Sequence, residues 1–159
     1  MRVHSGVLLL GLALASSSIS PAQEASGFVG AWRQDISDTS PKPRSSIPKE
    51  LVIKLAGDTL MVTMKGPGKV HSVDVTFQIG GPEVTYTGLD GDEFHIKAAR
   101  DGNSLVFDGR EHEKGSDYPV HEVWTLRNKS EGQVLVDTKN AKDPDEPAKV
   151  SAEYERVKQ

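Results

Sequence analysis

The stretch Phe28-Val29-Gly30-Ala31-Trp32 decides the fold of this chain, because it sets a tryptophan two residues after a glycine at the start of a β-rich sequence. A tryptophan side chain buries on the order of 200 Å² when it is enclosed. We therefore predict a strand over residues 28–36 in which Trp32 is buried. Because the motif is short, the rest of the chain has to agree with it.

The residues before this motif predict export. Arg2 is followed by an apolar run over residues 7–15 and then by small residues up to Ala22, a pattern typical of a secretory signal peptide. The apolar run is shorter than the ~20 residues that a membrane-spanning helix needs. We expect residues 1–22 to be removed and residues 23–159 to form a single domain, secreted or periplasmic, with no membrane anchor.

Composition excludes several classes of function. The chain has no cysteine, so neither a disulfide framework nor a lipidated cysteine is available. Its 19 basic and 23 acidic residues give a net charge of −4, which argues against a nucleic-acid or anionic-membrane partner. Catalytic and metal-binding motifs are absent from the sequence, so we predict no enzyme, cofactor or metal. A cysteine-free exported chain also favours a bacterial origin.

From residue 50 onward, short alternating runs of apolar and polar residues are separated by glycine-containing turns. This pattern predicts an all-β, up-and-down antiparallel meander of about 8–10 strands. Six turns, each placed from local residues, keep one apolar face through seven strands, for example by pairing Ile53 with Val62 and Phe107 with Trp124. The turns are Gly57-Asp58, residues 66–69, Gly80-Gly81, residues 90–92, Asp101-Gly102 and Gly115-Ser116. A sheet of this size tends to close, so we expect a barrel, with a two-sheet sandwich as the alternative.

With the Gly30-Ala31-Trp32 start and the meander behind it, the chain resembles the lipocalin-like (calycin-type) barrels, above all their small secreted bacterial members. The resemblance implies that a basic residue of the last strand lies across the N-terminal tryptophan, and Arg156 stands in that position. Gly30, Trp32 and Arg156 are thus the expected closure of the barrel. About ten strands is nearer the fatty-acid-binding barrels, although the three prolines of residues 37–49 do not favour their helical lid.

The resemblance also implies that the interior binds a small hydrophobic or amphipathic molecule. The candidate ligand-binding residues share the apolar face, and they are His71, Tyr86, Phe94, Phe107, Glu122 and Trp124. The aromatic side chains would form the apolar wall, and the polar pair, with His71 opposite Met64, would orient the ligand. The aromatic residues are equally explained as plain core, and the polar pair as the edge of the apolar face.

Binding of this kind requires an interior void of roughly 300 Å³ or more. A barrel filled to ordinary core density would instead favour a protein–protein interaction module, such as a secreted inhibitor or envelope partner. That module would act through the loop over residues 37–49. The oligomeric state cannot be read from the sequence.

The opposite face of the meander carries His95, Asp108, Glu93, Arg110 and His121. We interpret these residues as a solvated outer surface with cross-strand charge pairs. The alternative is an acid–base or metal site. The fixed positive charge of Arg110 disfavours a metal there, because it repels a second cation at close range.

Overall fold

The computed structural model of the chain describes residues 26–40, 47–129, 132–141 and 149–158. The described residues contain one 3₁₀ turn, η1 (Ser26–Phe28), and otherwise form antiparallel strands. The strands are β1 (Gly30–Ser40), β2 (Glu50–Ala56), β3 (Thr59–Lys65), β4 (Ser72–Gln78), β5 (Val84–Thr87), β6 (Glu93–Asp101), β7 (Ser104–Glu113), β8 (Ser116–Lys129), β9 (Gly132–Ala141) and β10 (Val150–Arg156). The predicted signal peptide, residues 1–22, lies outside the described residues.

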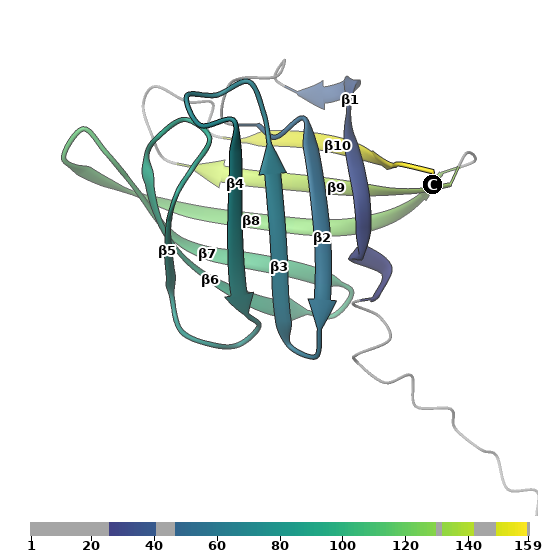
Figure 1. Ribbon diagram of the computed structural model, residues 1–159, viewed down its shortest axis with the longest axis horizontal. Coiled ribbons are helices and arrows are strands. Elements are labelled where there is room, and N and C mark those ends of the chain that lie inside the picture. Colours follow the sequence, from purple (N-terminus) through teal and green to yellow (C-terminus); the bar gives the residue numbers. More distant parts are fainter. Residues whose placement is uncertain (1–25, 41–46, 130–131, 142–148, 159) are drawn as a thin grey trace, which may run out of the picture.

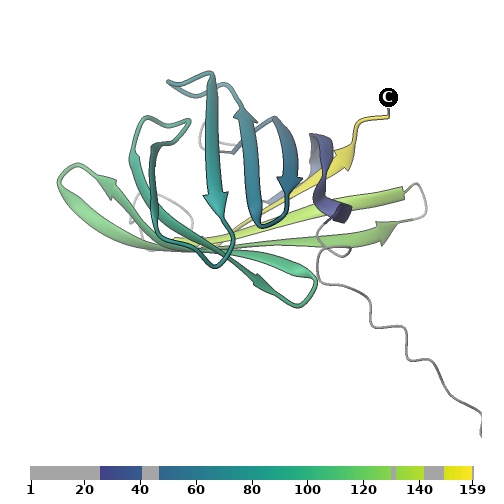
Figure 2. The same cartoon turned by 60° about the horizontal axis from the view of Figure 1, so that its bottom comes forward.

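All ten strands belong to one sheet in the order β4-β3-β2-β1-β10-β9-β8-β7-β6-β5. Strands that follow one another in the chain are therefore neighbours, except for β4 and β5, and β1 pairs with β10 to bring the two ends of the meander together. In Figure 1, β2, β3 and β4 stand upright in front of β7 to β10, which run across behind them. Figure 2 shows the same crossing from a second side. The predicted all-β meander is confirmed as a nearly closed barrel.

The interior is built from alternate residues of each strand, as a barrel requires. In β4, for example, Val73, Val75 and Phe77 are buried while the residues between them are exposed. The least exposed hydrophobic side chains come from β1, β2, β3, β7, β9 and β10, and they are Trp32, Leu51, Ile53, Leu60, Leu105, Leu135 and Tyr154. Among the described residues, no helix is long and apolar enough to cross a membrane.

One end of the barrel is closed by Trp32. Its side chain is fully enclosed, and its indole Nε1 donates a hydrogen bond to the Phe28 carbonyl at 2.9 Å. The Arg156 guanidinium lies 4.3 Å from the centre of the Trp32 ring and donates to two backbone carbonyls just before β1, each at 2.6 Å. Gly30 has a φ of 145°, and a Cβ there would lie 2.6 Å from Arg156 Nη1. The glycine of the motif therefore makes room for the guanidinium.

The hairpin registers are partly as predicted. In the β2–β3 hairpin Ile53 lies opposite Val62, as the Gly57-Asp58 turn predicts. The other predicted hairpins that form have a register that differs from the prediction by two residues. Phe107, for example, lies opposite Glu122 and not opposite Trp124. Because side chains alternate with a period of two, a slip of two leaves every residue on its predicted face.

Two further expectations are wrong. The predicted hairpin at Gly80-Gly81 does not form, because β4 and β5 are the two edges of the sheet. Instead the Gly80 N–H donates to the carbonyl of Ala98 in β6 at 2.8 Å. The predicted loop over residues 37–49 begins later, since β1 continues to Ser40. Residues 41–46, the middle of that loop, lie outside the described residues.

Candidate functional site

The barrel contains a cavity at the end opposite Trp32, between the β5–β6 loop and the segment that leads into β2. Its volume is about 60 Å³. It is lined by Ile47, Pro48, Met64, Tyr86, Gly88, Leu89, Asp90, Phe94, Glu122, Trp124, Asp137, Lys139 and Val150. The expectation of a void of roughly 300 Å³ is therefore wrong, although the barrel is not filled at this end.

An aromatic cluster occupies the centre of the barrel and explains why the cavity is small. The ring of Phe107 lies 5.4 Å from that of Phe77 and 4.7 Å from that of Trp124, measured between centroids. Phe107 is buried in this cluster and does not line the cavity. Its position is that of a core residue.

Four of the six predicted ligand-binding residues come together at the cavity: Tyr86, Phe94, Glu122 and Trp124. Tyr86 and Phe94 are cross-strand neighbours in β5 and β6 with stacked rings 5.4 Å apart. His71 is not among the lining residues; it is exposed in the loop between β3 and β4. The predicted pairing of His71 with Met64 is wrong, because the loop is two residues longer and Val73 takes that place.

Glu122 and Asp137, the inner acid pair, form the polar wall of the cavity. They project from the neighbouring strands β8 and β9, where Trp124 lies opposite Asp137. The Trp124 indole Nε1 donates to Glu122 Oε1 at 2.5 Å, and the two carboxyl groups are hydrogen-bonded to each other. A hydrogen bond between two carboxyls requires one of them to carry a proton.

One buried oxygen atom at this wall, Asp137 Oδ1, has no hydrogen-bond partner among the described residues. The buried hydroxyl of Tyr154 also has none, but Tyr154 does not line the cavity. Buried polar atoms are almost always hydrogen-bonded, because leaving one unpaired costs about 1–3 kcal/mol. The cavity therefore has a polar atom that a bound molecule could satisfy.

Burial sets the protonation of these groups. It raises the pKa of Asp137 well above its usual range, and the nearby charge of Glu122 raises it further. Burial also raises the pKa of Glu122, against the opposing charge of Lys139. The pKa values of Tyr86 and Tyr154 are raised as well, chiefly by burial, so both hydroxyls stay neutral. Burial thus favours the protonated form of both acids of the inner acid pair.

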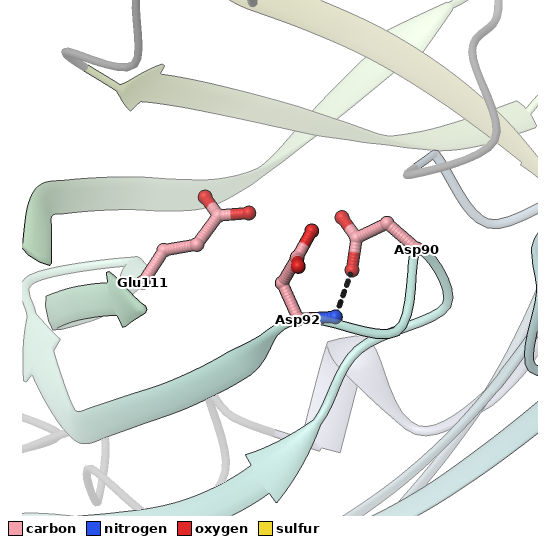
Figure 3. A group of neighbouring side chains, drawn as sticks. All are labelled: Asp90, Asp92 and Glu111. Atoms are coloured by element: carbon pink, nitrogen blue, oxygen red, sulfur yellow. Dashed lines mark hydrogen bonds between the residues drawn. The ribbon is translucent and has the colours of Figure 1, made fainter. Parts of the chain in front are cut away.

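More carboxylates stand beside the cavity, where Asp90, Asp92 and Glu111 have oxygen atoms within 4.8 Å of one another (Figure 3). The Asp92 N–H donates to Asp90 Oδ1 at 3.2 Å, and burial, with the charge of Asp90, raises the pKa of Asp92. Such oxygens are ligands of the kind that Ca²⁺ and Mg²⁺ prefer. However, Glu111 pairs with Lys139 Nζ at 3.4 Å, and that ammonium lies 4.9 Å from the centre of the Phe94 ring.

A second hollow, of about 460 Å³, lies on the outside at the other end of β10. Its lining includes Asp38, Lys129 and Arg156. Lys129 donates to Asp38 at 2.6 Å and also bonds Glu153, while Arg156 covers Trp32. Because these two cations are engaged by the protein itself, we assign no ligand to this hollow.

The polar residues predicted on the outer face form cross-strand pairs there. His95 Nε2 lies 2.8 Å from Glu93 Oε1, and His121 Nδ1 lies 2.6 Å from Asp108 Oδ1. Arg110 lies opposite His95 and not opposite His121, which corrects the predicted register. Each histidine thus has its own carboxylate, and the two histidines do not converge on one point.

Asp137, Lys139, Glu111 and Leu89 were not among the predicted site residues. Leu135, Asp137 and Lys139 share one face of β9. Alternation does not reveal this, because the consecutive residues Val134, Leu135 and Val136 are all apolar and all buried. Leu89 falls in a loop and has no periodic signal.

The fold can now be compared with known proteins. No protein-family model matches the chain, and no curated protein matches its sequence. Among solved structures, it is similar to lipid binding protein 8 of Caenorhabditis elegans in its apo form, with 15% identity and a TM-score of 0.62 over 89% of this chain and 100% of that one. A Schistosoma mansoni fatty acid binding protein in complex with arachidonic acid has 13% identity and a TM-score of 0.62, covering 85% and 99%.

Zebrafish ileal bile acid-binding protein, complexed with cholic acid, has 18% identity and a TM-score of 0.59 over 83% of this chain and 100% of that one. Likeness at this identity concerns the path of the backbone. It shows that the chain shares the β-barrel fold of these three proteins.

Proposed function

We propose that this protein binds a small amphipathic molecule inside the barrel. The apolar part of the ligand would lie against Tyr86, Phe94 and Trp124, and its polar end would reach the inner acid pair. The observation that carries the proposal is the buried oxygen atom at the cavity wall that has no partner among the described residues, Asp137 Oδ1. A ligand that supplies hydrogen bonds there removes a cost that the empty protein bears.

The fold supports the same proposal. The similar structures are those of a lipid binding protein, a fatty acid binding protein and a bile acid-binding protein. Binding pockets are commonly apolar with a few convergent polar groups, which describes this cavity. A cavity of about 60 Å³ admits only a few heavy atoms without movement. We therefore infer that a longer apolar tail displaces Leu89, whose buried side chain closes the cavity from the β5–β6 loop.

Calorimetric titration with 1-hexanol tests the proposal, because this neutral probe has an apolar tail and one hydroxyl. The variant Met64→Trp fills the cavity from β3, where Met64 is a lining residue. The matched control, Met61→Trp, places the same side chain on the exposed face of β3. We expect one-to-one binding by the parent protein and by Met61→Trp, and at least about tenfold weaker binding by Met64→Trp.

Equal binding by both variants would place the ligand outside the cavity and would overturn the proposal. Absence of binding by the parent protein, together with no response to the ionic analogues described below, would also overturn it. In that case the cavity would hold water only, which can satisfy buried polar groups in a polar site.

We also propose that the protein acts outside the cytoplasm, as a secreted or periplasmic protein. The support is the leader-like sequence of residues 1–22. Mass determination of the protein recovered from its host tests this directly: loss of a segment ending near Ala22 supports export, and an intact N-terminus contradicts it.

A further inference from the structure

We infer that the barrel selects a ligand with a cationic ammonium head over one with a carboxylate head. This inference rests on the proposed binding function and names the chemical class of its ligand. It is carried by the charges of the residues that line the cavity and by the unpartnered carboxyl oxygen among them.

Acids outnumber bases around the cavity. The charged lining residues are three acids, Asp90, Glu122 and Asp137, and one base, Lys139. The base is already matched, because Lys139 Nζ pairs with a fourth carboxylate, that of the buried Glu111, at 3.4 Å. A ligand that enters this space meets a surplus of carboxyl groups.

The geometry of the inner acid pair suits a hydrogen-bond donor. Asp137 Oδ1 is a buried acceptor on a lining residue and has no partner among the described residues. Glu122 Oε1 accepts from the Trp124 indole. An ammonium group carries donors and no acceptor, so it can donate to Asp137 Oδ1. A carboxylate ligand carries only acceptors and would need the pair to remain protonated.

Charge favours the same choice. Without ligand, the two carboxyls share a proton, because burial opposes two negative charges side by side. When an ammonium group binds, its positive charge can replace that of the shared proton. The proton can then leave to solvent, and the net charge of the site does not change. A fatty acid head, by contrast, would bring another negative charge into this low-dielectric space.

The test compares three probes with the same six-carbon tail: hexylammonium, 1-hexanol and hexanoate. All are titrated by calorimetry into the full chain at pH 7.4 and fixed salt. We expect hexylammonium to bind at least about tenfold more tightly than hexanoate, which corresponds to about 1.4 kcal/mol, with 1-hexanol between them.

A double variant tests whether the preference arises at the inner acid pair. Glu122→Gln with Asp137→Asn keeps the shape of both side chains and removes their charge, so the ratio of hexylammonium to hexanoate affinity should fall to about one. The control Asp108→Asn removes a carboxylate from the exposed outer face of β7, where it pairs with His121. It should leave the ratio unchanged, which also controls for the change in net charge.

The outcomes separate this inference from the proposed function. Hexanoate binding as tightly as hexylammonium would overturn the charge preference while 1-hexanol binding still supports the proposed function. A preference that survives in the double variant would place the ammonium elsewhere and overturn the assignment. If none of the three probes binds, the proposed function fails and this inference fails with it.

Discussion

Replacing Asp137 by asparagine should stabilise the ligand-free protein at neutral pH. The pKa of Asp137 is raised in the folded state, so between its unfolded value of about 3.9 and its folded value the folded protein binds more protons than the unfolded chain. Stability therefore falls as pH rises through that range. Asparagine does not titrate, and its amide can donate to Glu122 in place of the shared proton.

The size of this stabilisation follows from the protonation of Asp137 in the folded and unfolded states. Each pKa unit of the rise costs about 1.4 kcal/mol of stability at high pH, and asparagine, which does not titrate, removes this cost. We expect Asp137→Asn to be about 1–3 kcal/mol more stable than the parent at pH 7.5. At pH 4.5, where the unfolded aspartate is also partly protonated, the gain should be under about 1 kcal/mol.

Urea denaturation at the two pH values, followed by far-ultraviolet circular dichroism, measures this difference. Asp108→Asn is the matched control, because that aspartate is exposed on the outer face, and its effect should stay within about 0.5 kcal/mol at pH 7.5. The reasoning is refuted if Asp137→Asn is less stable than the parent at pH 7.5, or if its effect is the same at both pH values. Either result would mean that Asp137 is ionised and well paired in the ligand-free protein.

Three further predictions concern the two ends of the barrel. Arg156→Ala should lower the free energy of unfolding, measured in urea, by about 2–3 kcal/mol, because it removes the cation–π contact with Trp32 and two charged hydrogen bonds. No loss of stability would mean that the guanidinium does not hold the Trp32 end of the barrel closed. Gly30→Ala should cost about 3 kcal/mol, since its φ of 145° strains any side chain and its Cβ would meet Arg156. Gly132→Ala, with a similar φ of 138° and open space around it, should cost about 1–2 kcal/mol; equal losses would discount the clash. Leu89→Ala should lower the free energy of unfolding by about 2–3 kcal/mol. It should also strengthen 1-hexanol binding about fivefold, which corresponds to about 1 kcal/mol. Unchanged affinity in calorimetry would show that Leu89 does not close the cavity.

Turn chemistry explains which strand registers could be predicted. At Gly57-Asp58 the glycine occupies the first turn position, where a positive φ is needed, and the predicted pairing is correct. At Asp101-Gly102 the prediction placed glycine second. The structure again places Gly102 first, with a φ of 53°, so that Asp101 joins the strand and pairs with Ser104. The predicted apolar face is still correct, because the predicted register differs from the observed one by an even number of residues.

The break in the barrel could not be predicted in the same way. The alternation of apolar residues continues through both β4 and β5, so it predicts a hairpin between them. Periodicity reports which face of a strand is buried, and carries no information on which neighbour the strand pairs with. The edges at β4 and β5 are set by the curvature of the whole sheet, which depends on residues far apart in the chain.

The same limit applies to the candidate site, because alternation predicts which side chains point inward but not where along the barrel they lie. Tyr86, Phe94, Glu122 and Trp124 were placed inside from alternation alone, and all four line the cavity. The depth of each residue along the barrel axis depends on the register between strands. Phe107, which was predicted to line the site, lies opposite the lining residue Glu122, yet its ring packs against Phe77 and Trp124 in the core. Alternation does not report this packing.

The central claim is that a small amphipathic ligand binds at the inner acid pair, and the two tryptophan indoles test it most directly. The Trp124 N–H donates to Glu122 at the cavity, whereas the Trp32 N–H donates to the Phe28 carbonyl at the opposite end. In a nitrogen-15 NMR titration with hexylammonium, the account predicts a saturable shift of the Trp124 indole resonance and an unmoved Trp32 resonance. Saturation of binding with no change at Trp124, or equal changes at both indoles, would contradict it.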